Sequence, residues 1–308
     1  MRGRDVLSIS DLSPEELDFL LRTALAMKRD GSRPVLQGKT IAMLFEKPSL
    51  RTRVSFEVGM KQLGGGAIYL SQSEVGLGQR EPVADVARVL SRYVAGIVAR
   101  TYAQSTLEEL AQAADVPVVN ALSDDEHPCQ ALADLLTVRE KKGRLAGVRI
   151  AFVGDGNNVA ASLAMAAALA GAEFVIASPP DYALPGAWVE AARQWARRTG
   201  GAVETVAEPE EAVKGADVVY TDVWTSMGQE ASHRQRLEAF QGYQVDEALL
   251  RLAKPDAIFM HDLPAHRGEE VVDAVIEGPQ SVVFDQAENR LHAQKALLAA
   301  IMGEEAAI

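Results

Sequence analysis

The chain has 308 residues, of which 48% are hydrophobic and 24% charged, and this length exceeds what a single hydrophobic core usually supports. We therefore expect two domains. The formal net charge of −12 argues against a nucleic-acid partner, and the single cysteine, Cys129, rules out an intrachain disulfide.

The N-terminus is charged at Arg2, Arg4 and Asp5 and lacks the apolar run of an export signal. Together with the single cysteine, this indicates a cytoplasmic protein. The first predicted element is a helix, because Ser13 suits the N-cap and Pro14 the first helical position.

The first half of the chain alternates short apolar runs with amphipathic segments. We expect strands at about 40–45, 67–70, 95–99 and 116–120. We expect helices at about 52–63, 83–93, 107–114 and 130–142. The stretch 71–81 is rich in turn residues and has no periodicity, which predicts a mobile loop. Such alternation is typical of a parallel sheet with helices on both faces.

The same pattern restarts after Gly143 and Gly147. Expected strands lie at about 148–153, 174–177, 217–222 and 257–261. Expected helices lie at about 158–170, 187–198 and 287–302. The apolar stretch 159–172 is rich in alanine and too short to span a bilayer, so it indicates a buried helix. The chain is thus predicted to form two α/β halves joined by one helix.

The segment Ser49-Leu50-Arg51-Thr52 connects a predicted strand to a predicted helix. A helix start offers free backbone N–H groups and the positive end of the helix dipole. The two hydroxyls add donors, and Arg51 can donate two hydrogen bonds to a phosphate. The pattern predicts an anion site, with an ordinary capped helix start as the alternative.

His127, Pro128, Cys129 and Gln130 lie at the start of the connecting helix. The imidazole of His127 can polarise a carbonyl oxygen, and the side chain of Gln130 can accept a hydrogen bond from an amide. Isolated histidines are more often structural, so both interpretations stay open at this point.

Gly154 and Gly156 form a glycine turn between a strand and a helix, as in dinucleotide-binding proteins. The third glycine position of that fingerprint is Val159, and no acidic residue clearly ends the next strand. The turn is therefore weak support for NAD, whereas a small polar ligand agrees with where open α/β sheets bind ligands.

Polar motifs also follow the later strands. Asp222 follows one strand with Ser226 close behind it, which suits an α-ammonium group, although Trp224 could equally anchor a buried loop. The string His-Asp-Leu-Pro at 261–264 follows the last strand, and Arg290 begins the last helix. Most of these motifs gather at predicted strand ends, where open α/β sheets bind ligands.

The strings at 47–53, 127–130, 222–230 and 261–264 resemble, in order and approximate spacing, those of the aspartate/ornithine carbamoyltransferase family. The Ser-Met-Gly segment at 226–228 resembles the ornithine-specific members. The resemblance implies an α/β fold with two similar-sized domains, each a parallel sheet flanked by helices, and a C-terminal helix that returns to the first domain. It implies a carbamoyl-phosphate-binding domain at 1–138 with the helix at about 288–308, and an ornithine-binding domain at 139–287.

The implied reaction transfers the carbamoyl group of carbamoyl phosphate, the donor, to the side-chain amine of L-ornithine, the acceptor. The products are L-citrulline and phosphate, and the reaction belongs to arginine biosynthesis. Family members use no metal and no organic cofactor, and they form homotrimers with active sites between subunits. The implied partners are the two substrates and further copies of this chain, without nucleic acid or membrane.

The resemblance also implies roles for individual residues. Arg100, His127 and Asp262 are expected to be catalytic. The donor-site residues are expected to be Ser49, Leu50, Arg51, Thr52, Arg100, His127, Pro128, Cys129, Gln130, Asp262, Leu263 and Arg290. The acceptor-site residues are expected to be Asn158, Asp222, Ser226 and Met227, with Asn157 beside Asn158. In this scheme His127 polarises the carbamoyl carbonyl and Gln130 orients the carbamoyl nitrogen.

Two positions depart from the family pattern. Family members usually have cysteine at the position of Asp262, so the acceptor site would hold two carboxyl groups, Asp222 and Asp262. Either both stay ionised and stabilise a cationic amine, or they share a proton and one pKa rises. In the stretch 71–81 the family often has a glutamine that reaches a neighbouring subunit. Gly76 stands there, which leaves Gln79 or Arg80 as candidates for that contact.

Three other functions compete with this one. A carbamoyltransferase for a modified ornithine or another amine acceptor would reveal itself in an acceptor screen. An NAD-linked oxidoreductase would bind NAD. An anion-binding regulatory protein, suggested by Asp262, would bind carbamoyl phosphate without forming citrulline.

Overall fold

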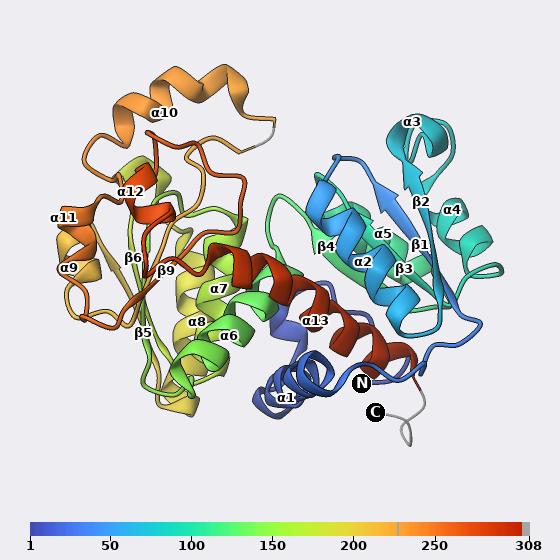
Figure 1. The fold of residues 1–308 in the computed structure, drawn as a ribbon. Helices are drawn as coiled ribbons and strands as arrows, with labels where there is room; N and C mark the ends of the chain where they lie inside the picture. Colours follow the sequence, from blue (N-terminus) through green and yellow to red (C-terminus); the bar gives the residue numbers. More distant parts are fainter. Residues whose placement is uncertain (227, 304–308) are drawn as a thin grey trace. The chain divides into compact units, whose positions relative to one another are not determined.

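The computed structural model describes residues 1–226 and 228–303, which form two compact units (Figure 1). The first unit comprises Met1–Leu136 and the chain from Glu288 onward, and the second comprises Thr137–Ala287. The unit boundaries fall within two helices, α6 (Pro128–Lys142) and α13 (Val283–Met302). Among the described residues, no helix combines the length and the hydropathy needed to cross a membrane.

The first unit is built on a four-stranded parallel sheet in the order β2-β1-β3-β4. Its strands are β1 (Thr40–Phe45), β2 (Gly66–Ser71), β3 (Gly96–Arg100) and β4 (Val118–Leu122). Most of α6 and most of α13 belong to this unit. Its other helices are η1 (Ile9–Asp11), α1 (Pro14–Asp30), α2 (Leu50–Gln62), α3 (Gln72–Val75), α4 (Val83–Leu90) and α5 (Gln104–Ala113).

Helices cover both faces of this sheet, which is why its strands are apolar almost throughout. Ala42 and Leu44 of β1 point into a core shared with α4 and α5. On the opposite face the backbone of β3 approaches α13 closely, because a Cβ added to Gly96 would lie 2.7 Å from Sδ of Met302. The C-terminal helix therefore packs against the first unit, as predicted.

The second unit is built on a five-stranded parallel sheet in the order β7-β6-β5-β8-β9. Its strands are β5 (Arg149–Val153), β6 (Glu173–Ala177), β7 (Ala202–Val206), β8 (Val218–Tyr220) and β9 (Ile258–Met260). Its other helices are α7 (Asn158–Leu169), η2 (Pro180–Tyr182), α8 (Gly186–Thr199), α9 (Pro209–Val213), η3 (Glu230–Ser232), α10 (His233–Ala239), α11 (Glu247–Leu250) and α12 (Asp273–Ile276).

Two layers of apolar side chains hold this sheet between its helices. One core joins Ala151 and Val153 of β5 to residues of α9, α11 and α12. In the sheet itself, Phe152 stacks on Tyr220 of the neighbouring strand with ring centroids 5.3 Å apart. Helix α7 is buried from Val159 to Leu169, which confirms the expectation from its alanine-rich sequence. The predicted fold class, two helix-flanked parallel sheets, is confirmed.

Some local predictions were wrong. Strand β7 was missed because it is an edge strand whose residues are half exposed, so its polar side chains interrupt the apolar run. The stretch 71–81 was predicted to lack structure, but it contains α3, where the side chains of Ser71 and Glu74 form a capping box. Helix α4 ends at Leu90 rather than at 93.

The strand orders place one switch point in each sheet. From β1 the chain moves to β2 on one side, and later to β3 on the other side. From β5 it moves to β6 and β7 on one side, and later to β8 and β9 on the other. In open parallel sheets, ligands bind beyond the carboxyl ends of the strands at such points. The segments that follow β1, β3, β5 and β8 are therefore the places to look.

Candidate active site

In the first unit, the predicted anion-binding segment follows β1, at the switch point. Ser49 is the N-cap of α2, and its hydroxyl accepts a hydrogen bond from the N–H of Thr52 at 3.4 Å. The first turn of α2 presents further backbone N–H groups, the usual setting for a bound anion. Leu50 is 76% exposed, so its side chain packs against little and its backbone is the part suited to a ligand.

Two arginines from distant parts of the chain join this segment. Arg290 of α13 donates from Nη2 to the Thr52 hydroxyl at 2.5 Å, and both residues are buried. Arg100 is the last residue of β3, next to β1 across the switch point, and it is 9% exposed. With Arg51 on the first turn of α2, the unit gathers three guanidinium groups, the preferred cations for phosphate.

His127 is buried beside these cations. Burial lowers the pKa of its imidazole well below the ordinary value of 6.5. The next causes, in order, are the positive charges of Arg290, Arg100 and Arg51. The imidazole is therefore neutral at physiological pH, and it can polarise a carbonyl as a hydrogen-bond donor without adding a charge.

Gln130 is also buried, and its amide has a fixed orientation. Nε2 donates to Oδ1 of Asp134, one helical turn further along α6, at 2.8 Å. Oε1 accepts no hydrogen bond from the described residues. The amide oxygen is thus available to an N–H donor on a ligand, while the carboxylate of Asp134 keeps the amide from flipping. Asp134 was missed, although its spacing of four residues from Gln130 on one helix face was a usable signal.

Pro128 and Cys129 contribute differently from their neighbours. Pro128 begins α6, and Cys129 donates its thiol to the carbonyl of Asn120 at 3.4 Å. Burial raises the pKa of the Cys129 thiol to about 12, so it remains protonated. The side chain of Cys129 therefore belongs to the core, and its backbone N–H in the first turn of α6 is its means of contacting a ligand.

In the second unit, the segments after β5 and β8 meet at the switch point. Asn157 caps α7: its Oδ1 accepts from the N–H groups of Val159 and Ala160. Its Nδ2 donates to Oδ2 of Asp222 at 2.7 Å. Asn158, the first residue of α7, follows Asn157 directly in the chain. The hydrogen bond of Asn157 therefore links the start of α7, where Asn158 lies, to Asp222.

Asp262 lies close to Asp222 within the second unit. One oxygen of each carboxyl group and one ring nitrogen of His261 all lie within 4.8 Å of one another. Burial raises the pKa of Asp222 well above 3.8, and the negative charge of Asp262 and a hydrogen bond with it raise it further. Of the two possibilities left by the sequence, a proton shared between the carboxyl groups agrees with this arrangement.

The hydrogen bonds of His261 fix its tautomer. Nδ1 accepts from the N–H of Leu263 at 2.9 Å, so the proton resides on Nε2, which lies 3.1 Å from Oε1 of Glu270. Nδ1 also lies 3.5 Å from Oδ1 of Asp262. Leu263 adopts a left-handed backbone with φ of 59°, which is unusual for a residue with a branched side chain.

The segment after Asp222 is held by its surroundings. The hydroxyl of Thr225 lies 3.1 Å from Nδ1 of His233, and the backbone N–H of Ser226 donates to the side chain of Gln229 at 3.2 Å. Met227, the remaining predicted acceptor-site residue, lies outside the described residues. Trp224 does anchor this segment, because its ring stacks on Phe240 with centroids 5.4 Å apart.

The glycine turn has a packing role that explains its sequence without a dinucleotide. The N–H of Gly156 donates to the carbonyl of Tyr182 at 2.8 Å. A Cβ on Gly156 would lie 2.2 Å from the backbone nitrogen of Leu184. The space that the glycine leaves is therefore filled by the protein's own backbone at Leu184 and not by a ligand. The glycine turn then gives no support for a dinucleotide site.

Two groups of side chains in the second unit have ligand atoms close enough together to hold a metal ion. One group is Asp222, His261 and Asp262, and the other is His266, Glu269 and Glu270. In the first group both ring nitrogens of His261 already have partners. In the second, Oε1 of Glu270 accepts from the backbone of His266 at 2.6 Å and faces His261. Both groups are explained by these hydrogen bonds.

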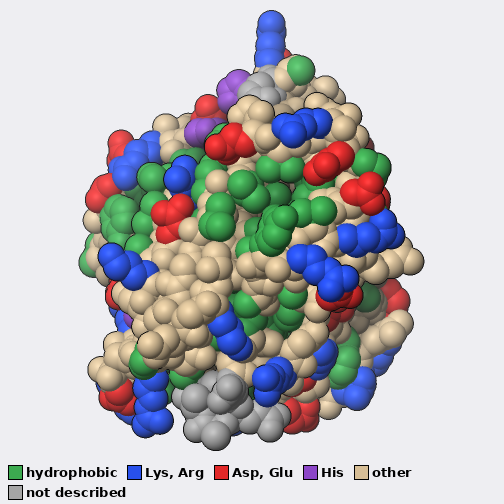
Figure 2. Space-filling model, turned by 90° about the vertical axis from the view of Figure 1, so that its right-hand side faces the viewer, with side chains coloured by type: hydrophobic (Ala, Val, Ile, Leu, Met, Phe, Trp, Pro, Cys, Tyr) green, Lys and Arg blue, Asp and Glu red, His purple; other side chains and the backbone are tan. Residues whose placement is uncertain are grey.

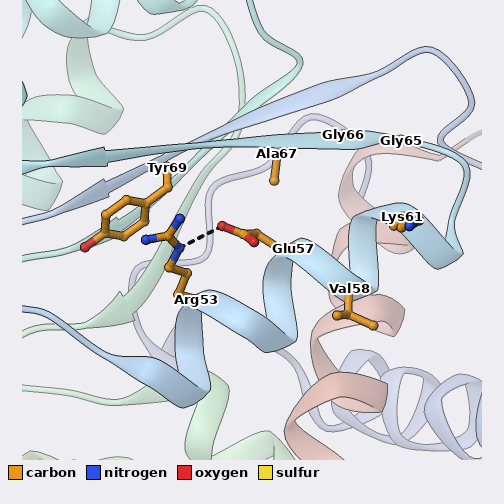
Figure 3. A pocket seen from close by; sticks show the side chains of 8 residues that line it. All are labelled: Arg53, Glu57, Val58, Lys61, Gly65, Gly66, Ala67 and Tyr69. Atoms are coloured by element: carbon orange, nitrogen blue, oxygen red, sulfur yellow. Dashed lines mark hydrogen bonds and ion pairs between the residues drawn. The ribbon is translucent and has the colours of Figure 1, made fainter.

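The first unit also contains a cavity of about 500 Å³ away from the predicted residues. It lies between α2 and β2, and Figure 3 shows Arg53, Glu57 and Tyr69 lining it. The guanidinium of Arg53 lies 4.0 Å from the centroid of the Tyr69 ring, and its Nε is 2.9 Å from the carboxylate of Glu57. Arg53 is therefore already paired within the cavity.

Comparisons with known proteins agree on one family. Residues 4–140 match the domain described as aspartate/ornithine carbamoyltransferase, carbamoyl-P binding domain, and residues 146–301 match the Asp/Orn binding domain of the same description. The ornithine carbamoyltransferase of Thermococcus kodakarensis is 55% identical over 98% of both chains, and that of Bacillus subtilis is 55% identical over 97% of this chain and 94% of its own. The structure of the ornithine carbamoyltransferase from Pyrococcus furiosus superposes with a TM-score of 0.94 at 53% identity, covering 98% of this chain and 97% of that one.

Proposed function

This chain belongs to the aspartate/ornithine carbamoyltransferase family, and from that membership we propose that it transfers the carbamoyl group of carbamoyl phosphate to the side-chain amine of L-ornithine. The products are L-citrulline and phosphate, as in arginine biosynthesis. The observation that carries the proposal is the grouping of three arginines, a neutral histidine and an oriented glutamine amide in the first unit.

We assign the donor to the first unit. The backbone of residues 49–52, with the hydroxyls of Ser49 and Thr52, suits the phosphate oxygens, and Arg51 and Arg290 balance their charge. Arg100 and His127 suit the carbamoyl oxygen, and Oε1 of Gln130 suits the carbamoyl NH2. Carbamoyl phosphate is already an activated mixed anhydride, so positioning and charge stabilisation account for the catalysis.

We assign the acceptor to the second unit. The N-terminus of α7 at Asn158 suits the α-carboxylate of ornithine, because a helix start favours negative charge. Asp222 and Ser226 suit the α-ammonium group. Asp262, and the backbone of Leu263, follow the neighbouring strand and suit the side-chain amine that attacks.

In the reaction, the neutral amine attacks the carbonyl carbon and a tetrahedral oxyanion forms. The C–O bond to phosphate then breaks, and the leaving phosphate takes the amine proton. The amine has a lysine-like pKa of about 10.4, so deprotonating it at pH 7 costs about 4–5 kcal/mol. We therefore expect kcat/KM for ornithine to climb from pH 7 to about 9.

We further propose a homotrimer, as in the sequence-based expectation, and a cytoplasmic location. The homotrimer is supported by exposed apolar side chains on neighbouring elements of the first unit, namely Val54, Val58, Ile68, Val89 and Tyr93. Figure 2, which views the molecule from the side of this unit, shows hydrophobic side chains gathered in the middle of the face. Light scattering of the purified protein measures the number of subunits.

A citrulline assay tests the proposed activity. The enzyme is incubated with carbamoyl phosphate and, in separate reactions, with ornithine, N-acetylornithine, putrescine or aspartate. Citrulline formed from ornithine, at a kcat/KM well above the carbamoylation of the other amines, is the expected result. Preference for another amine identifies a different acceptor, and donor binding without any product identifies an anion-binding protein.

A further inference from the structure

Arg236 lies outside every predicted site motif, yet its guanidinium reaches both segments that carry the acceptor-site residues. Its Nη1 donates to Oδ2 of Asp155 at 2.6 Å and to the backbone carbonyl of Trp224 at 2.7 Å. The side chains of Arg236 and Asp155 are 11% and 10% exposed, so this ion pair is largely removed from water.

The two contacted segments carry the residues proposed for the two α-groups of the acceptor. Asp155 belongs to the turn after β5, which leads into the helix start at Asn158. Trp224 lies midway between Asp222 and Ser226 in the segment after β8. Arg236 therefore joins the segment proposed for the α-carboxylate to the segment proposed for the α-ammonium group.

Aromatic packing holds the arginine in place. The guanidinium lies 4.7 Å from the centroid of the Tyr182 ring, which in turn packs on Phe240. Phe240 also stacks on Trp224, the residue whose carbonyl the arginine holds. The planar guanidinium is suited to this position because it can stack on a ring and donate in its plane at the same time.

We propose that Arg236 is a positioning residue for acceptor binding: it fixes the separation between the segment at 155–158 and the segment at 222–226. This inference rests on the proposed function. The α-carboxylate and the α-ammonium group of an amino acid are attached to one carbon. A site that binds both must therefore hold its two binding segments at a fixed distance from each other. The hydrogen bond from Asn157 to Asp222 supplies a first link, and Arg236 supplies the second.

Three variants separate this role from general stabilisation. Arg236→Gln removes the ion pair, and Arg236→Lys keeps the charge but loses the planar fork. Arg234→Gln is the matched control, because Arg234 lies on the same helix and its side chain is 93% exposed. For each variant, KM for ornithine and kcat are measured, together with the Kd for carbamoyl phosphate in the absence of an acceptor.

We expect Arg236→Gln to raise the acceptor KM by about 10–100-fold, with kcat at saturating ornithine reduced less than about 3-fold. We expect Arg236→Lys to fall between it and the wild type. The Kd for carbamoyl phosphate stays within about 2-fold, because the donor-site residues lie in the other unit. An unchanged acceptor KM, or an equal loss of donor affinity, overturns the proposal, as does the same effect in Arg234→Gln.

Amide hydrogen exchange distinguishes failure of this inference from failure of the proposed function. If the wild type carbamoylates none of the amines, the proposed function fails while the link itself can still be examined. Residues 222–236 should then exchange faster in Arg236→Gln than in the wild type, and at the wild-type rate in Arg234→Gln. Equal exchange in all three proteins refutes the link whatever the enzyme does.

Discussion

The two units use the same architecture for ligands of opposite charge. Each is a parallel sheet with its polar residues beyond a switch point, and each begins a helix there, α2 in one and α7 in the other. The first unit surrounds its candidate site with Arg51, Arg100 and Arg290. The second gathers carboxyl groups instead. A formal net charge of −12 for the whole chain conceals this division.

The difference extends to how each site responds to pH. Guanidinium groups stay charged and His127 stays neutral at physiological pH, so the donor site has a constant charge there. In the second unit, burial raises the pKa of Asp222 well above its ordinary value and that of Asp155 to about 6. Constant charge suits a phosphate donor, whereas carboxyl groups with raised pKa values suit an acceptor amine that must lose a proton.

Replacing His127 tests whether the donor site of the first unit has a constant charge, and it should have the largest effect on kcat. We expect His127→Gln to lower kcat by about 10²–10³-fold, the range for removing one donor from a developing oxyanion. His292→Gln is the control, because His292 lies on α13, is mostly buried and pairs with Glu288 at 3.5 Å. If wild-type kcat/KM shows a titration between pH 6 and 7 that His127→Gln abolishes, the imidazole is not neutral and the contrast between the units fails.

Asp155→Asn tests whether acceptor affinity in the second unit depends on a titrating ion pair. The pKa of Asp155 is raised to about 6, so its carboxylate pairs fully with Arg236 above that pH and loses its charge below it. L-norvaline, which is ornithine without its side-chain amine, serves as the probe, and its inhibition constant is measured from pH 5 to 8. We expect the variant to bind it about 10-fold more weakly than the wild type above pH 7.

The ratio of the two inhibition constants should approach one below pH 5.5, because the wild-type ion pair is then also lost. Glu238→Gln, which alters the exposed partner of Arg234 on the same helix, should match the wild type throughout. A ratio that is constant from pH 5 to 8 contradicts the assignment.

Asp262→Asn tests the cost of the paired carboxyl groups. Because the pKa of Asp222 is higher in the folded protein than its ordinary value, folding binds a proton and stability falls as pH rises through the raised pKa. After burial, the charge of Asp262 is the largest cause of that shift. Removing it should raise Tm at pH 8 by about 2–4 °C, equivalent to about 1 kcal/mol.

The gain should shrink as the pH is lowered through the raised pKa, since Asp222 is then protonated in the wild type as well. Asp181→Asn, at an exposed position of the same unit, should leave Tm unchanged at both pH values. A Tm for Asp262→Asn that equals or falls below the wild type at pH 8 means that the carboxyl groups do not repel each other in the folded protein.

The sequence predicted the two sheets because buried parallel strands are continuous apolar runs, and β1 was predicted to the residue. It missed β7, where half exposure breaks that run. It predicted the start of α7 at Asn158, whereas α2 begins at Leu50, two residues before its expected start. The expectation that Arg290 and Thr52 share one site rested on family resemblance, since no local pattern joins residues 238 positions apart.

Arg236 shows what neither periodicity nor resemblance supplied. Its partners, Asp155 and the carbonyl of Trp224, lie 81 and 12 residues away, and one of them is a backbone atom without any sequence signature. The partner role of Asp134 could have been predicted, because a carboxylate one helical turn from Gln130 is a recognisable pattern. Residues that act through other residues are the hardest to predict, since their type follows from contacts that only the fold defines.

Cys129 gives the smallest expected effect and tests whether the arginines of the first unit act on a ligand or on a protein group. Arg290 lies near enough to lower the pKa of the thiol, yet burial outweighs it and raises the pKa to about 12. We therefore expect native enzyme to resist iodoacetamide at pH 8 and to be labelled only after unfolding, as mass spectrometry would show. Cys129→Ala should keep kcat within about 3-fold, since the thiol lies against the Asn120 carbonyl. Rapid labelling of the native protein, prevented by carbamoyl phosphate, would instead mean that Arg290 stabilises a thiolate beside the donor, and the first unit would then hold a titrating group of its own.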